Sequence, residues 1–193
     1  MRILVVGTGA REHAIVKALI RTGTDPKDIV CAPGNEYIAK EVEVRDSVEI
    51  SDNLGLVKIA LGEAIGLAII GPEGPLVAGL ADDLRDQGIL VFGPNQEAAA
   101  LEGSKQFAKE VMAAADIPTG MSRRCETKAE VEDAMDQFGA PYVIKADGLA
   151  AGKGVIVTSD KIEAIAHAEK FMEEGVLVEE FLDGQEVSLF FLS

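Results

Sequence analysis

The chain has 193 residues, of which 18 are lysine or arginine and 33 are aspartate or glutamate, giving a formal net charge of −15 at pH 7. This acidic balance argues against binding to nucleic acid or to an anionic membrane, because either surface repels a chain of the same charge. Cys31 and Cys125 match no metal-ligand spacing, and no secretory leader or membrane-spanning apolar run is visible. We therefore expect a soluble cytoplasmic protein with reduced thiols.

Short β-rich runs alternate with helical patterns through the first half of the chain. The predicted strands are Ile3–Val6, Ile29–Ala32, Leu67–Ile70 and Leu90–Phe92, each bounded by Gly or Pro. Apolar residues on one helical face predict a helix over residues 11–21. This order predicts an α/β fold with a parallel sheet, helices on both of its faces, and ligands at the carboxyl ends of the strands.

Three loops follow the predicted strands at those ends: residues 7–13, 33–35 and 71–73. The first contains Gly7-Thr8-Gly9, but the third glycine of a dinucleotide fingerprint is missing and the second strand ends in Ala32-Pro33 rather than in an acid. A nicotinamide cofactor is therefore disfavoured. A helix N-terminus with Arg11 nearby suits a phosphate monoester, and the alternative is a tight turn with a solvated arginine.

A helix capped by Ser104 is predicted to run from Lys105 to about Ala115, and a domain boundary is expected near Thr119–Arg124. Beyond it the pattern predicts a small α+β unit, built from a helical stripe, two strands, a second helix and two closing strands. Those segments are Val131–Phe138, Tyr142–Lys145, Val155–Val157, Asp160–Met172, Val176–Phe181 and Glu186–Phe191. Because the chain stops inside the last apolar run, we expect it to be truncated.

The stretch from Lys145 to Val155 reads Lys-Ala-Asp-Gly-Leu-Ala-Ala-Gly-Lys-Gly-Val. Its glycines, Gly148, Gly152 and Gly154, allow backbone N–H groups to approach an anion, while Lys145 and Lys153 supply positive charge. It is not a Walker loop, because only three residues separate the first two glycines and a strand follows instead of a helix. The stretch predicts a phosphate-binding loop within a hairpin, with an ordinary flexible turn as the alternative.

Acidic and apolar residues are mixed after the next predicted strand, in Val178-Glu-Glu-Phe-Leu182 and Asp183-Gly-Gln-Glu186. Backbone groups near Glu179 and Leu182 could read an adenine edge, and Glu186 could accept from ribose hydroxyls. A charged hairpin without a ligand is the alternative.

Seven motifs occur together in order: 7–13 (Gly-Thr-Gly-Ala-Arg-Glu-His), 33–35 (Pro-Gly-Asn), 71–77 (Gly-Pro-Glu-Gly-Pro-Leu-Val), 92–94 (Phe-Gly-Pro), 101–105 (Leu-Glu-Gly-Ser-Lys), 145–155 and 179–184 (Glu-Glu-Phe-Leu-Asp-Gly). With them, the chain closely resembles the N-terminal half of the phosphoribosylamine glycine ligase family, within the ATP-grasp superfamily. The resemblance implies an ATP-dependent ligase of de novo purine biosynthesis. Its substrates would be glycine and 5-phosphoribosylamine, joined through a glycyl phosphate to give glycinamide ribonucleotide, ADP and phosphate.

Matching positions carry the family's roles onto this chain. Lys105 and Lys145 would be catalytic and hold ATP phosphates, while Gly148, Gly152, Lys153 and Gly154 would form a lid over them. Glu179 and Leu182 would bind adenine, and Glu186 the ribose. In the N-terminal part Gly9, Arg11, Glu12 and Glu73 would bind the phosphoribosylamine or the substrate amines.

The resemblance also implies a domain plan. Residues 1–120 would form a Rossmann-like substrate-binding domain, residues 121–188 the ATP-grasp lid subdomain, and residues 189–193 the start of the remaining ATP-grasp domain. The magnesium ligands are expected downstream, so we expect this chain to be inactive as a ligase by itself. The alternative is a non-catalytic module that binds a nucleotide or a phosphosugar.

Overall fold

The computed structural model describes residues 1–148 and 153–189. The chain forms two compact units, Met1–Gly103 and Ser104–Ser193. This division lies before the expected boundary near Thr119–Arg124, because α6 (Lys105–Ala114) bonds to residues of the second unit such as Asp147 and Gly120. The expected limits of 1–120 and 121–188 would instead place α6 in the first domain.

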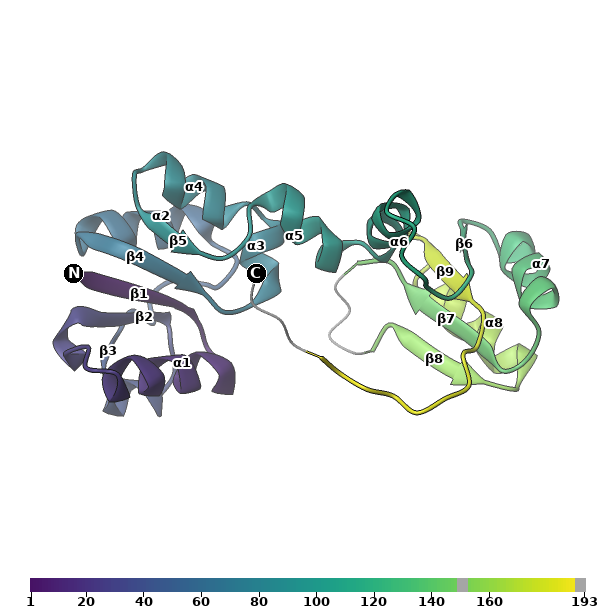
Figure 1. Ribbon diagram of the computed structural model, residues 1–193, viewed down its shortest axis with the longest axis horizontal. Coiled ribbons are helices and arrows are strands. Elements are labelled where there is room, and N and C mark those ends of the chain that lie inside the picture. Colours follow the sequence, from purple (N-terminus) through teal and green to yellow (C-terminus); the bar gives the residue numbers. More distant parts are fainter. Residues whose placement is uncertain (149–152, 190–193) are drawn as a thin grey trace. The chain divides into compact units, whose positions relative to one another are not determined.

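The first unit contains a five-stranded parallel sheet in the order β3-β2-β1-β4-β5 (Figure 1). Its strands are β1 (Arg2–Gly7), β2 (Ile29–Pro33), β3 (Glu43–Val44), β4 (Ile65–Ile70) and β5 (Leu90–Phe92). Its helices are α1 (Ala10–Arg21), α2 (Asn53–Gly62), α3 (Glu73–Val77), α4 (Leu80–Asp86) and α5 (Gln96–Gly103), with short 3-10 turns η1 (Pro26–Asp28) and η2 (Ile38–Lys40).

Successive side chains of the central strand β1 point alternately into two apolar cores, one on each face of the sheet. Ile3 and Val5 pack with Val16 of α1, whereas Leu4 and Val6 face the opposite core, which includes Leu56 of α2 and residues of α4. Successive side chains of a strand point to opposite faces, so a continuous apolar run must be covered on both sides. The predicted parallel sheet with helices on both faces is confirmed.

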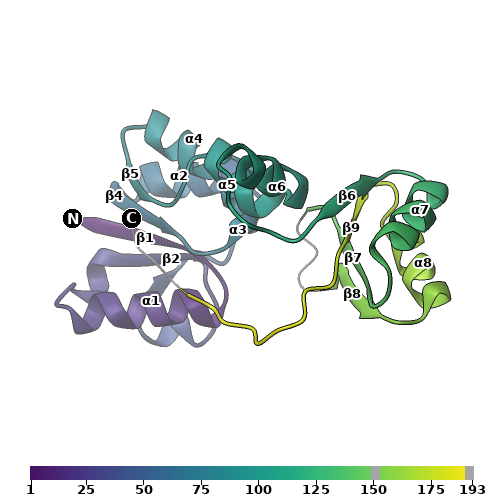
Figure 2. The same cartoon turned by 45° about the vertical axis from the view of Figure 1, so that its right-hand side comes forward.

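The second unit contains an antiparallel sheet in the order β6-β9-β7-β8. Its elements are α6, β6 (Ser122–Cys125), α7 (Lys128–Phe138), β7 (Tyr142–Ala146), β8 (Val155–Thr158), α8 (Lys161–Lys170) and β9 (Val176–Glu179). Figure 2 shows α7 and α8 together on one face of this sheet. Ile144 of β7 and Val178 of β9 pack beneath them, so the neighbouring residues Lys145 and Glu179 point to the opposite face.

One predicted strand is wrong in its described part. Residues 186–189 of the expected strand Glu186–Phe191 form no strand, and β9 ends at Glu179 rather than at Phe181. Residues 190–191 lie outside the described part of the chain. The prediction rested on a run of apolar residues, but a strand also needs a neighbouring strand to take up its backbone hydrogen bonds.

Both cysteines are buried and free, as a packing role requires. Burial is the main cause that raises the pKa of the Cys31 thiol to about 12. Burial also raises the pKa of Cys125. Neither thiol is therefore suited to act as a nucleophile.

Candidate functional site

The glycine-rich loop lies in the β7–β8 hairpin, as predicted. Tyr142 pairs with Thr158 and Lys145 with Val155, and the Ala146 N–H donates to the carbonyl of Gly154 at 2.7 Å. Gly148 has a φ of 91°, a conformation that favours glycine. Lys153 is exposed. Gly152 lies outside the described residues.

Helix α6 begins beside the start of this loop. Ser104 caps the helix by accepting from the Phe107 N–H, and the Asp147 carboxylate accepts from the Lys105 N–H at 2.7 Å. The ammonium of Lys105 donates to the carbonyl of Gly148 at 2.8 Å. Two predicted phosphate residues, one from a helix and one from the loop, are therefore brought together. The bond from the first turn of α6 to Asp147 was not predicted. The only sequence signal for it is the position of this acid directly before Gly148, the first glycine of the loop.

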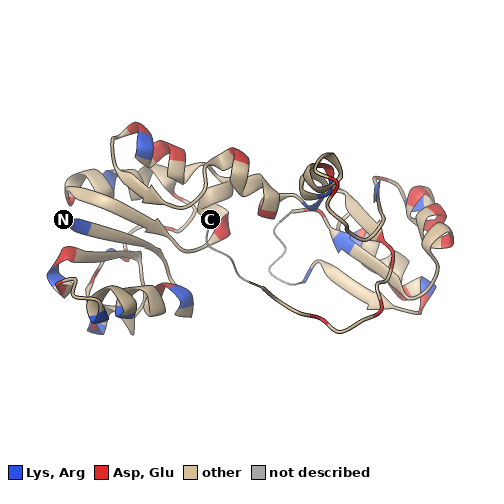
Figure 3. Ribbon diagram, viewed as in Figure 1, with Lys and Arg blue, Asp and Glu red and all other residues tan. Residues whose placement is uncertain are grey.

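Lys145 extends from β7 on the sheet face away from α7 and α8. Its ammonium lies 2.7 Å from Oε2 of Glu179, the last residue of β9. Glu179 is only 7 % exposed, so this carboxylate needs a cationic partner. Sequence reasoning missed Lys109 of α6, whose ammonium lies 3.7 Å from Oε1 of the same carboxylate. Figure 3 shows basic residues on α6 and β7, whereas α7 on the other face is lined with acidic residues.

The segment after β9 carries Leu182 and Glu186, the other two residues predicted to bind a nucleotide, and both are exposed. Leu182 is 66 % exposed, and Glu186 also lies at the surface. The segment is joined to the chain before β6, since the Glu180 N–H donates to the Met121 carbonyl and the Met121 N–H donates to the Glu180 carboxylate. Glu179 and Leu182 therefore lie on either side of Glu180, which these two hydrogen bonds hold in place. Glu186 lies further along the chain.

A second cluster forms in the first unit, at the carboxyl ends of β1 and β4. These neighbouring strands lie where the strand order reverses, the usual ligand position in open parallel sheets. Arg11 donates to the Gly71 carbonyl at 2.6 Å and lies 3.7 Å from the Glu73 carboxylate. Arg11, Glu73 and Gly71 line a pocket of about 370 Å³ that is otherwise mainly apolar, with Leu76 and Ala99 among its walls.

Glu12 differs from its predicted neighbours because its side chain points inward. It is 4 % exposed, and its carboxylate accepts from the Gly9 N–H at 2.6 Å at the start of α1. This is one half of a capping box, since Gly9 has no side chain to return the bond. Gly7 and Gly71 leave the space that Glu12 fills. The structure therefore gathers Gly9, Arg11 and Glu73 at one edge of the sheet, and Glu12 supports that edge from beneath.

Within residues 1–148 and 153–189, no group of three or more His, Cys, Asp or Glu side chains could hold a metal ion. In the same residues, no helix is long and apolar enough to cross a membrane.

Two family models match consecutive parts of the chain. "Phosphoribosylglycinamide synthetase, N domain" matches residues 1–102, and "Phosphoribosylglycinamide synthetase, ATP-grasp (A) domain" matches residues 103–193. The chain belongs to the phosphoribosylglycinamide synthetase family. The resemblance inferred from the motifs is confirmed, and the junction of the two family models lies within one residue of the division between the structural units.

Individual relatives agree with this assignment. The chain is 56 % identical over 196 residues to a phosphoribosylamine–glycine ligase of Leifsonia xyli, covering 100 % of this chain and 46 % of that protein. It is 53 % identical over 190 residues to one of Streptomyces coelicolor, covering 98 % and 45 %. The crystal structure of the Thermotoga maritima ligase superimposes with a TM-score of 0.75 at 31 % identity, covering 96 % of this chain and 45 % of that one. The chain spans about half the length of the curated relatives it matches.

Proposed function

We propose that this chain supplies the substrate-binding domain and the nucleotide-binding lid of an ATP-dependent ligase that joins glycine to 5-phosphoribosylamine. The reaction would belong to de novo purine biosynthesis and take place in the cytoplasm. The observation that carries the proposal is the arrangement of Lys105 and Lys145 about the glycine-rich loop within one unit. Membership of the phosphoribosylglycinamide synthetase family supports the same chemistry.

In the proposed reaction an oxygen of the glycine carboxylate attacks the γ-phosphorus of ATP, and the bond to the β-phosphate oxygen breaks to release ADP. The amine of phosphoribosylamine then attacks the carbonyl carbon of glycyl phosphate, releasing inorganic phosphate and a proton. Lys105 and Lys145 would neutralise the charge that develops on the phosphates. Gly148, Gly152, Lys153 and Gly154 would close over them and exclude water. No step is assigned to magnesium, whose ligands we expect outside the described residues.

The remaining roles follow from position. Backbone groups at Glu179 and Leu182 would read adenine, and Glu186 would accept from the ribose hydroxyls. At the edge of the first sheet, Gly9 and Arg11 would face the phosphate of phosphoribosylamine, with Glu73 near the amine. Arg11 is suited to this because its pairing with Glu73 is loose, at 3.7 Å, and a phosphate can replace that partner.

The first test measures ADP binding to the 193-residue chain by isothermal titration calorimetry. Lys145→Met should weaken binding at least about tenfold, because one charge-assisted phosphate contact is lost. Lys128→Met is the matched control, since it removes a lysine–glutamate pair (2.9 Å to Glu169) from the same unit outside the proposed site. Equal loss in both variants would contradict the proposal.

The second test measures ligase turnover with ATP, glycine and phosphoribosylamine. We expect none from the 193-residue chain alone and turnover from a longer polypeptide that contains it. ADP binding without ligase activity in such a polypeptide would favour the non-catalytic module instead.

A further inference from the structure

Three charged side chains meet on the face of the second sheet opposite α7 and α8. The carboxylate of Glu179 has one oxygen 2.7 Å from the Lys145 ammonium and the other 3.7 Å from the Lys109 ammonium. The side chains of Glu179, Lys109 and Lys145 are 9 %, 16 % and 30 % exposed, so Lys145 is the most accessible of the three. Two lysines and one glutamate leave a single positive charge, which suits an anion.

Lys109 is held in place independently of Glu179. Its ammonium donates to Oγ1 of Thr119 at 2.9 Å and to the carbonyl of Gly120 at 2.7 Å. These contacts fix the cation close to Glu179 whatever Lys145 does. Within residues 1–148 and 153–189, the Lys145 ammonium bonds to Glu179 and has no second anchor of this kind, and its side chain leaves β7 next to the glycine-rich loop.

The pair between Lys145 and Glu179 creates a conflict. A phosphate that binds Lys145 must compete with a nearly buried carboxylate at hydrogen-bonding distance. If Lys145 turned away, Glu179 would be left as an uncompensated charge in a poorly solvated place, which is strongly unfavourable. A second cation beside Glu179 removes that penalty.

We propose that Lys109 is a positioning residue that keeps Glu179 neutralised while Lys145 turns to bind a phosphate. The inference rests on the proposed function, since it assumes that the anion is the phosphate chain of a nucleotide. Lys109 acts through Glu179 and need not touch the ligand. The distance of 3.7 Å can shorten when Lys145 leaves, because a lysine stem has four rotatable bonds.

The experiment measures binding of inorganic tripolyphosphate to the 193-residue chain by calorimetry. Lys109→Met should weaken binding about tenfold, because Lys145 is then needed by Glu179. Lys109→Arg should bind as the wild type does, since it keeps the cation. Lys128→Met, which breaks an exposed lysine–glutamate pair elsewhere in the unit, should also bind normally.

A pair of double variants separates positioning from general charge. Lys109→Met with Glu179→Gln should recover binding, because no carboxylate then competes for Lys145. Lys109→Met with Glu180→Gln has the same net charge but keeps the Glu179 carboxylate, so it should stay weak. Normal binding by Lys109→Met, or equal recovery in both double variants, would overturn the inference.

A fallback variant and a comparison of two ligands cover the cases in which Lys109→Met does not fold or the proposed function itself fails. If Lys109→Met loses its far-ultraviolet circular dichroism, Glu179→Gln alone replaces it, and this variant should bind tripolyphosphate at least as tightly as the wild type. Weaker binding by Glu179→Gln would contradict competition for Lys145. Failure of the proposed function would look different: wild-type chain would bind ADP no better than tripolyphosphate, whereas failure of the inference is confined to the variants.

Discussion

Glu12 and Gly71 show how one side chain determines the shape of the sheet edge that carries Gly9, Arg11 and Glu73. A β-carbon added at Gly71 would overlap Oε1 of Glu12 and lie 2.8 Å from its Cγ. Glu12 cannot move outward without leaving the Gly9 N–H, which it caps. The glycine is required here by space, and the position of Arg11 depends on it because Arg11 donates to the Gly71 carbonyl.

Gly71→Ala should therefore destabilise the chain by about 1–3 kcal/mol, the usual range for forcing atoms into a filled site. Urea unfolding measures the change. Gly62→Ala at the end of α2 is the matched control, because no atom beyond its chain neighbours and its own helix backbone lies within 4 Å of the added β-carbon, and it should be neutral or slightly stabilising in a helix. In a Glu12→Ala background the same Gly71→Ala change should cost much less, and an unchanged cost would show that the clash with Glu12 is not the cause.

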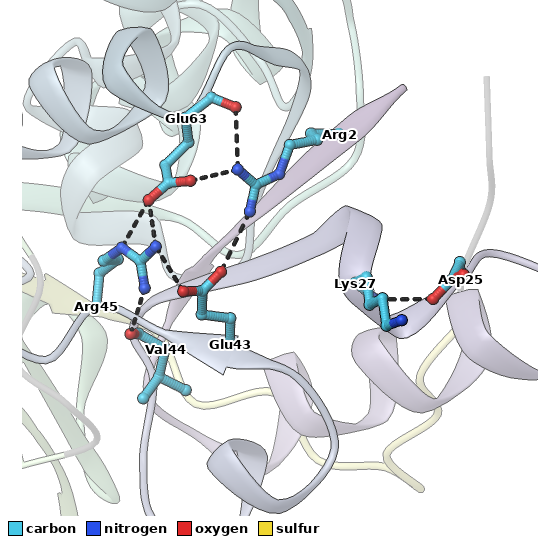
Figure 4. Close-up of polar contacts among 7 residues, drawn as sticks. All are labelled: Arg2, Asp25, Lys27, Glu43, Val44, Arg45 and Glu63. Atoms are coloured by element: carbon cyan, nitrogen blue, oxygen red, sulfur yellow. Dashed lines mark hydrogen bonds and ion pairs between the residues drawn. The ribbon is translucent and has the colours of Figure 1, made fainter.

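At the scale of elements, four charged side chains form an ion-pair network near the start of β1. Arg2 of β1 and Arg45, which follows β3, both pair with Glu63 at the end of α2 and with Glu43 of β3 (Figure 4). Nε of Arg45 donates to Glu63 at 2.8 Å. Glu63 has an 18 % exposed side chain, so the network is less screened than an ordinary surface pair. It connects three elements at the end opposite the candidate site.

The hydrogen bond from Arg45 is the main cause that holds the pKa of Glu63 below its ordinary value of 4.5. A lowered pKa means that the folded chain favours the charged carboxylate, so the stabilisation is complete above the ordinary pKa and is lost as the pH falls through the lower folded value. Glu63→Gln should cost on the order of 1 kcal/mol of unfolding free energy at neutral pH and progressively less in acid.

Urea unfolding of both proteins over a pH series checks this prediction. Lys17→Gln serves as the comparison, since it breaks a more exposed pair with Glu41 (3.1 Å) in the same unit and should cost less. A difference between wild type and Glu63→Gln that stays constant down to strongly acidic pH would contradict the role of the ionised carboxylate.

At the scale of the whole molecule, each unit has its own core. Both apolar clusters of the first unit draw only on residues before Gly103, and the cluster beneath α7 and α8 draws only on residues of the second unit. A unit that buries a complete core of its own meets the main requirement for folding alone.

Residues 1–103 produced separately should therefore fold and unfold cooperatively, as followed by circular dichroism during heating. A shorter piece ending at Gly88 should have a lower unfolding midpoint, because it lacks β5 and the buried residue Ile89. A featureless, non-cooperative transition for residues 1–103 would show that the first unit depends on the second.

The sequence by itself determined the elements with strong periodicity and the place of the glycine-rich loop between two strands. Strands β1, β2, β4 and β5 of the first sheet, α1, α6 and the β7–β8 hairpin were predictable, because runs of apolar residues and glycines act locally on the backbone. The two-residue edge strand β3 was not predicted. The polar strand β6, Ser-Arg-Arg-Cys, was missed, since it forms by pairing with β9 and carries no pattern of its own.

Only the tertiary structure decided which side chains meet. It placed Lys109 beside Glu179, turned Glu12 inward beneath the loops that hold Gly9 and Arg11, and assigned α6 to the second unit. Each of these depends on contacts between segments far apart in the chain. Local patterns determine whether a segment can be a helix or a strand, but the partner of a charge depends on how those elements pack.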